Sequence, residues 1–178
     1  MRVPGIREPY VRRFCWDVVR GSEPRHVRHE PLPGAPTMEC FSIVPEQVAR
    51  FGGEQVLGWA IFEWRKVMIE AEFHTVWRNP NGDLVDLTPR PIPLRKILFL
   101  PDPNRRYEGR QVDNVRKPLV NDPRIRRFIQ LAERLTALLN EGDLADQYGE
   151  IPATPEMRDV QNEMGQLQLA LAERYGRP

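Results

Sequence analysis

The sequence predicts an α+β fold in which one helix is followed by a small antiparallel sheet, with two C-terminal helices packed on it. Two observations predict this class. Between Val56 and Leu100 the apolar residues alternate with a period of two and include many β-branched and aromatic side chains, as is typical of strands. After Asp122 the apolar residues recur at spacings of three and four, as is typical of amphipathic helices.

The composition is that of an ordinary globular protein. The chain has 178 residues, 40% hydrophobic and 29% charged, with a formal net charge of +1, which argues against disordered and collagen-like classes. A net charge this small gives no overall field toward nucleic acid or anionic lipid. The sequence shows neither a signal peptide nor an apolar run of about 20 residues. Two cysteines make no disulfide framework, so we expect a cytoplasmic protein.

Two segments precede the predicted sheet. Residues 1–37 contain six prolines, which break regular structure, so we expect an extended arm on the surface. A helix of about a dozen residues follows and ends at Gly52 and Gly53. Because a proline inside a helix clashes with the preceding turn, Pro45 predicts that this helix begins at Ser42 or Val44, or that it is kinked.

The rest of the chain is a sheet and two helices. We expect a polar, irregular connection over residues 101–121, and then helices capped by Asp122 and Thr154. The heptad-like spacing of the last helix leaves open a homodimer through it. Residues 1–121 are thus predicted as the core and 122–178 as a helical hairpin of the same domain. The predicted strands cover residues 56–64, 67–77, 83–88 and 97–100.

A hairpin between the second and third strands can be placed in register from its turn. The segment Asn79-Pro80-Asn81-Gly82 favours a three-residue loop with Gly82 in the left-handed conformation. Trp77 is then opposite Val85. Side chains alternate along a strand, so one face of the hairpin is apolar and predicted to face the core. It carries Phe73, Thr75, Trp77, Val85 and Leu87.

The opposite face of this hairpin carries polar and ionisable side chains. His74 and Asp86 are diagonal neighbours across the strand pair, with a predicted Cβ separation of roughly 5–8 Å. A carboxylate at that position can accept a proton from one imidazole nitrogen and leave the other nitrogen free to act as a base. The face consists of Glu70, Glu72, His74, Asp86 and Thr88.

Residues 38–89 resemble the transglutaminase-like superfamily, the broad papain-like group of cysteine-dependent acyl-transfer enzymes. In that group a nucleophilic cysteine starts a helix, and strands bearing a histidine and an aspartate follow. The matching features of this chain, in order, are Cys40, Gly52-Gly53, His74-Thr75-Val76-Trp77 and Asp86-Leu87-Thr88-Pro89. The tryptophan lies three residues after His74, where the family usually has it at two.

The resemblance implies a cysteine-dependent amide hydrolase or acyl transferase with Cys40, His74 and Asp86 as catalytic residues. We expect Trp59, Glu72 and Thr88 to contact a protein or peptide substrate. No cofactor and no metal are expected. The alternative is a non-catalytic interaction protein on a degenerate version of this fold, which binds a protein or nucleic-acid partner through its arginine-rich segment or its terminal helices.

Other interpretations of the same residues stay open. A divalent metal could bind to Glu70, Glu72, His74 and Asp86, and a zinc ion to Cys15, His26, His29 and Cys40. The segment after residue 101 is rich in arginine, and all but three of the 26 basic residues in the chain are arginine. It could contact nucleic acid, although only Tyr107 is available to stack on a base. The residues concerned are Arg105, Arg106, Arg110 and Arg116.

Overall fold

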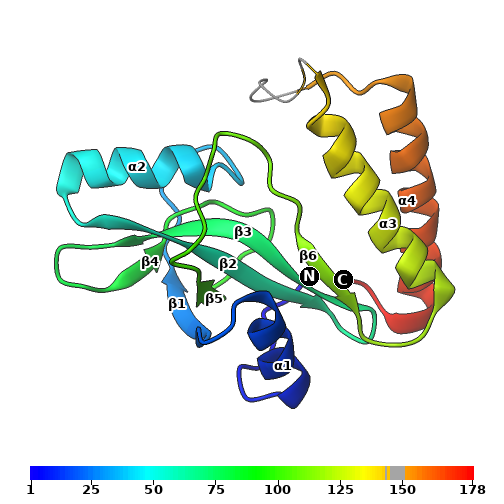
Figure 1. Ribbon diagram of the computed structural model, residues 1–178, viewed down its shortest axis with the longest axis horizontal. Coiled ribbons are helices and arrows are strands. Elements are labelled where there is room, and N and C mark those ends of the chain that lie inside the picture. Colours follow the sequence, from blue (N-terminus) through cyan, green and yellow to red (C-terminus); the bar gives the residue numbers. More distant parts are fainter. Residues whose placement is uncertain (143, 145–150) are drawn as a thin grey trace. The chain divides into compact units, whose positions relative to one another are not determined.

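The computed structural model describes residues 1–142, 144 and 151–178, and these form two compact units. The first, called here the barrel unit, consists of Val3–Phe62 and Ala71–Arg106. The second, called the helical unit, consists of Met1–Arg2, Glu63–Glu70 and Tyr107–Pro178. Figure 1 shows the helices and strands of both.

The strands of the barrel unit close on themselves. They run in the order β2-β5-β1-β4-β3, and β3 also pairs with β2. The expected α+β class is confirmed, but the expected small antiparallel sheet is wrong, because five strands form a barrel and β1 and β4 are parallel. The strands are β1 (Arg25–His29), β2 (Glu54–Trp64), β3 (Met68–Arg78), β4 (Leu84–Asp86) and β5 (Lys96–Pro101).

The N-terminal region supplies the strand that closes the barrel. Helix α1 (Pro9–Val18) begins at a proline, which the first helical position tolerates, and buries Val11, Phe14 and Cys15 on one side. Strand β1 then lies between β4 and β5. The expectation of an extended surface arm is therefore wrong for residues 9–18 and for Arg25–His29.

Helix α2 (Cys40–Phe51) starts earlier than expected and contains Pro45. A proline here removes one backbone hydrogen bond, the one to the carbonyl of Phe41. The first turn is held by other contacts, since the backbone N–H of Ser42 and of Ile43 donate to the carbonyl of Glu39 at 3.2 and 3.1 Å. The start at Ser42 or Val44 is corrected to Cys40, which becomes the first residue of the helix.

The hairpin β3–β4 has the predicted register. Trp77 pairs with Val85, and Gly82 has a positive φ of 90°. The backbone N–H of Gly82 donates to the carbonyl of Asn79 at 2.9 Å, closing the turn. On the predicted core face Val85 packs with Leu87 and with Ile43 of α2.

The end of α2 is fixed against β3 by a close approach of main chains. The indole N–H of Trp77 donates to the carbonyl of Gly52 at 2.9 Å. Gly53 has a φ of 86°, and a Cβ there would lie 2.2 Å from the carbonyl oxygen of Arg78. Only glycine fits this position, so the two glycines set where the helix stops and β2 begins.

The helical unit contains the two predicted C-terminal helices, α3 (Pro123–Leu139) and α4 (Pro155–Tyr175), which lie side by side (Figure 1). The predicted caps are confirmed: Asp122 accepts from the backbone N–H of Arg124, and Thr154 from that of Met157. The connection expected to be irregular contains strand β6 (Val115–Pro118), which adjoins β3.

Both helices cover the tip of the β2–β3 hairpin, which belongs to the same unit. Ile125 and Ile129 of α3 and Leu171 of α4 are buried with Trp64 and Val67. Within the described ranges, no helix is long and apolar enough to cross a membrane.

Candidate catalytic site

His74 and Asp86 form a buried pair in the barrel unit. Nε2 of His74 lies 2.9 Å from Oδ1 of Asp86, and the exposed fractions of the two residues are 1% and 0%. The backbone N–H of Thr88 donates to the same oxygen at 3.2 Å. Asp86 therefore both orients the imidazole and holds the turn that follows β4.

Cys40 lies at the first position of α2, and it is buried, with 4% of its surface exposed. A helix N-terminus carries a partial positive charge from its unpaired N–H groups, which stabilises a thiolate relative to a thiol. Cys40 is also close enough to His74 to change the ionisation of the imidazole. In the fold, Cys40 thus acts on the same imidazole that Asp86 holds.

The pKa of His74 is raised from its ordinary value near 6.5 to about 10. Burial alone lowers this pKa, but the negative charge of the Cys40 thiolate raises it, and so does the carboxylate of Asp86. Burial raises the pKa of Asp86, but the charge and hydrogen bond of His74 outweigh burial and, with Arg90 and the backbone N–H of Thr88, hold this pKa below its ordinary value. At neutral pH the site therefore favours an imidazolium bonded to the carboxylate of Asp86.

The second nitrogen of the imidazole is not hydrogen-bonded. Nδ1 of His74 is buried, and no residue in the described part of the chain makes a hydrogen bond to it. It lies 4.0 Å from Oε1 of Glu72. One imidazole nitrogen is therefore fixed by Asp86, and the other remains able to exchange a proton.

Arg90 lies beside this pair, although no sequence pattern indicated it. Its guanidinium donates to both carboxylate oxygens of Glu72, at 3.1 and 3.2 Å, and its Nε lies 3.7 Å from Oδ2 of Asp86. The side chain is only 5% exposed and packs over the ring of Phe62. Glu72, expected to contact substrate, is thus engaged by Arg90.

His29 of β1, which the sequence suggested only as a possible zinc ligand, also lies beside this pair, because its strand belongs to the barrel and not to a surface arm. Its Nε2 lies 2.9 Å from the carbonyl oxygen of Thr88, and its Nδ1 lies 3.0 Å from that of Leu94. Oδ2 of Asp86 is 4.0 Å away. His29 therefore ties the end of β4 to the segment before β5.

Unsatisfied polar atoms gather at this site. In the described part of the chain, the buried side-chain polar atoms without a hydrogen-bond partner are Nδ1 of His74, Oδ2 of Asp86, Oγ1 of Thr88 and Nε of Arg90. Buried polar groups are ordinarily paired, because leaving one unpaired costs about 1–3 kcal/mol. Their concentration around one imidazole marks this position as the least satisfied part of the core.

Two other residues expected to contact substrate, Trp59 and Thr88, are both buried and bonded within the protein. Thr88 is buried, with its carbonyl bound to His29. Trp59 is also buried, and its indole N–H donates to Oδ2 of Asp102 at 3.0 Å. The ring of Trp59 lies 5.3 Å from that of Phe73 and faces the guanidinium of Arg105.

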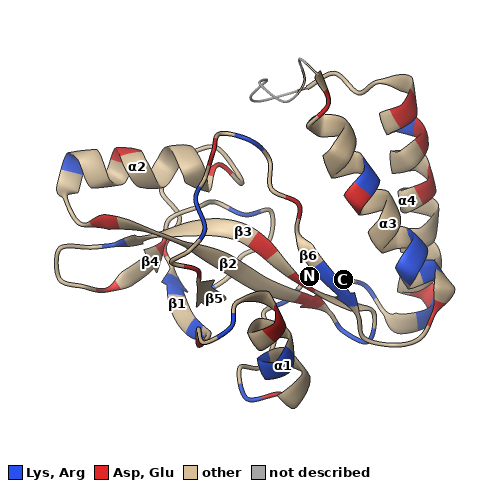
Figure 2. Ribbon diagram, in the orientation of Figure 1, with Lys and Arg blue, Asp and Glu red and all other residues tan. Residues whose placement is uncertain are grey.

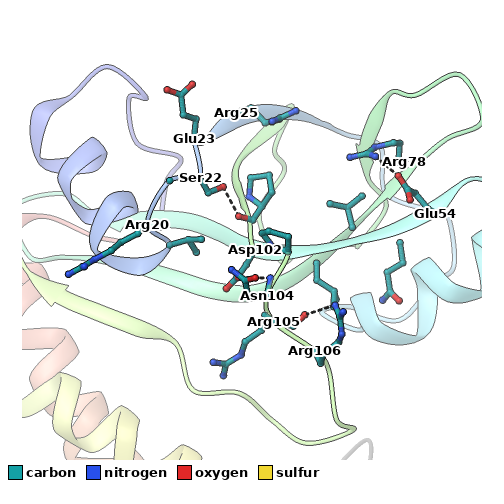
Figure 3. A pocket seen from close by; sticks show the side chains of 17 residues that line it. Arg20, Ser22, Glu23, Arg25, Glu54, Arg78, Asp102, Asn104, Arg105 and Arg106 are labelled. Atoms are coloured by element: carbon teal, nitrogen blue, oxygen red, sulfur yellow. Dashed lines mark hydrogen bonds and ion pairs between the residues drawn. The ribbon is translucent and has the colours of Figure 1, made fainter.

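A pocket of about 640 Å³ lies on the barrel unit (Figure 3). Its wall includes Arg78 and Glu54, which form an ion pair, and the segment from Pro101 to Arg106. Cys40, His74 and Asp86 are not among its lining residues.

The residues named for a metal ion or for nucleic acid have the following surroundings. Within the described ranges, no group of three or more histidine, cysteine or acidic residues is placed to hold a metal ion. Arg116, named for nucleic acid, is instead paired with Glu70 at 3.4 Å and with Asp113 at 2.8 Å. Arg106 donates to the carbonyl of Arg105. Arg105 and Arg106 belong to the barrel unit, and Arg110 and Arg116 to the helical unit.

No family model matches the chain, and neither the curated proteins nor the solved structures contain a match.

Proposed function

We propose that this protein is a cysteine-dependent amide hydrolase or acyl transferase of the transglutaminase-like kind, with Cys40 as nucleophile. The observation that carries the proposal is the buried imidazole of His74, which is bonded to Asp86 on one side and carries a pKa raised by Cys40 on the other. The position of Cys40 at a helix N-terminus supports the same role.

In the proposed reaction the proton of the Cys40 thiol passes to His74, giving a thiolate and an imidazolium. The thiolate attacks the carbonyl carbon of an amide, and a tetrahedral intermediate forms. His74 then donates its proton to the leaving nitrogen, the C–N bond breaks, and an amine departs from a thioester. Water or an amine attacks the thioester and gives a proton to His74, and Cys40 leaves as the thiolate.

Asp86 is a positioning residue in this scheme. Its carboxylate accepts a hydrogen bond from the N–H of Nε2, which keeps the imidazole in one orientation and stabilises the imidazolium. Arg90 holds Glu72 and faces Asp86, so it compensates the negative charges around the imidazole.

Alkylation by iodoacetamide tests the proposal, and the chain offers a control thiol. At pH 6 an ordinary thiol of pKa near 8.5 is almost wholly protonated, so we expect Cys40 to react at least about tenfold faster than a peptide thiol. Cys15 is also buried, and burial raises its pKa to about 11, so it should not react. Intact-mass measurements on the wild-type protein, Cys15→Ala and Cys40→Ala assign the label.

The variant His74→Gln extends this test, since it removes the proton acceptor. We expect alkylation of Cys40 in it to slow to the rate of a free peptide thiol or below. Reaction of wild-type Cys40 no faster than a free peptide thiol would remove the basis of the proposal.

One observation favours the second candidate function, a non-catalytic protein that binds a partner. Cys40 is only 4% exposed, and it is not among the residues that line the pocket described above. An unreactive Cys40 in the alkylation experiment is the result that this second function predicts.

A further inference from the structure

We infer that the substrate carries a carboxylate near its reacting carbonyl, and that Arg105 binds this carboxylate. The inference rests on the proposed function, because it takes Cys40 as the nucleophile. It names a specificity residue and a substrate class, an acidic peptide.

Arg105 lies over an aromatic surface in the barrel unit. Its guanidinium carbon is 5.5 Å from the ring centre of Trp59 and 5.5 Å from that of Phe73. The loop that carries it is anchored, since Asp102 accepts from the indole of Trp59 at 3.0 Å and from the backbone N–H of Asn104 at 3.2 Å. An arginine stacked on aromatic rings keeps its N–H groups available for a carboxylate.

Among the described residues, no carboxylate forms an ion pair with Arg105. Asp102, three residues before it, is engaged by Trp59 and Asn104. Two other arginines of this wall are engaged within the protein. Arg78 turns toward Glu54, and Arg106 folds back on the carbonyl of Arg105 (Figure 3).

Aromatic rings connect Arg105 to the catalytic residues. The ring of Phe73, the neighbour of His74 in sequence, lies 5.2 Å from the ring of Phe41, which follows Cys40. The two steps from the guanidinium of Arg105 to Phe73 and from Phe73 to Phe41 are covered by about three residues of extended chain, at roughly 3.5 Å each. The probes below take about three residues as the spacing between this carboxylate and the reacting carbonyl.

The pocket that Arg105 lines can hold the part of the substrate that carries the carboxylate. Its volume of about 640 Å³ is within the usual range of ligand sites. Its wall mixes apolar residues, including Val56, Leu57 and Pro103, with the polar groups of Ser22 and Asn104. A peptide segment that enters it passes Arg105.

Matched peptide probes test this inference. Acetyl-Glu-Ala-Ala chloromethyl ketone places the acid before the electrophile, and chloroacetyl-Ala-Ala-Glu amide places it after. Each probe has a neutral counterpart with Gln in place of Glu. Second-order rate constants for alkylation of Cys40 are measured by intact mass at low ionic strength. In at least one of the two pairs we expect the Glu probe to react about tenfold faster, as a charge-assisted contact allows.

The variants separate Arg105 from a general preference for acids. In Arg105→Gln the Glu-to-Gln ratio should fall to about one, and in Arg105→Glu it should fall below one, while iodoacetamide alkylates both variants at the wild-type rate. The matched control Arg106→Gln should keep the wild-type ratio.

The inference is overturned if the Glu and Gln probes react at equal rates in both pairs, or if a preference for Glu survives Arg105→Gln. Either result leaves the proposed function standing. Failure of the proposed function has a different signature, in which iodoacetamide and all four peptides alkylate Cys40 no faster than a free thiol. In that case the inference falls with it.

Discussion

Two arginine–glutamate pairs of nearly the same form occupy different surroundings. In the barrel unit Arg90 holds Glu72 through two bonds of 3.1 and 3.2 Å, and the side chains are 5% and 20% exposed. In the helical unit Arg127 holds Glu163 through two bonds of 2.7 and 2.8 Å, and the side chains are 51% and 42% exposed. Figure 2 shows charged residues of both signs along α3 and α4.

The surroundings of an ion pair, and not its length, decide how much stability is lost when the pair is removed. Water replaces the partner of an exposed charge, so a surface pair contributes little. A charge left unpaired in the core has no such replacement, and removal of one partner is costly. The shorter pair is therefore expected to be the weaker contributor to stability.

The largest effect is expected at the centre of the buried group. Asp86→Ala leaves the protonated imidazole of His74 without its carboxylate and removes the acceptor for Thr88, so we expect a loss of about 3–5 kcal/mol in the free energy of unfolding. Denaturant titration measures it. Asp86→Asn keeps the shape and should lose less, and a loss below 1 kcal/mol for Asp86→Ala contradicts the charge assignment.

A smaller effect is expected at the edge of that group. Arg90→Gln leaves Glu72 without a cation, but Glu72 is partly exposed and can reach water, so we expect a loss of about 2–3 kcal/mol. A double-mutant cycle with Glu72→Gln should give a coupling energy above about 1 kcal/mol. Independent, additive effects in the cycle would show that the two side chains do not act as a pair.

The smallest effect is expected at the exposed pair. Arg127→Gln should change the free energy of unfolding much less than Arg90→Gln does, and the change should shrink further in high salt. The same denaturant titration measures it. If Arg127→Gln costs as much as Arg90→Gln, burial is not what separates the two regions.

The parts of the fold that the sequence predicted well depend on local chemistry. The register of the β3–β4 hairpin follows from Gly82, which alone tolerates the left-handed conformation its turn needs. The helix starts at Pro123 and Pro155 follow from a capping residue before a proline. The diagonal pair of His74 and Asp86 was predictable because that register places it.

The parts of the fold and site that could not be predicted from the sequence depend on pairing between residues far apart in the chain. The five residues of β1 include four charged or histidine side chains, and only their place between β4 and β5 makes them a strand. Arg90 follows a proline in a loop, and nothing in its neighbours signals burial beside Glu72. The start of α2 at Cys40 was misplaced because Pro45 costs one hydrogen bond, which the rest of the first turn offsets.

The ionisation of His74 tests the central claim, that Cys40, His74 and Asp86 act as one unit. Imidazole NMR signals followed from pH 5 to 11 should give a pKa near 10, and Cys40→Ser should lower it, because the thiolate charge is lost. Since the folded pKa exceeds the ordinary 6.5, this proton stabilises the fold fully below pH 6.5, and that stability is lost as the pH rises through about 10. A wild-type pKa near 6.5 that Cys40→Ser leaves unchanged would contradict the account.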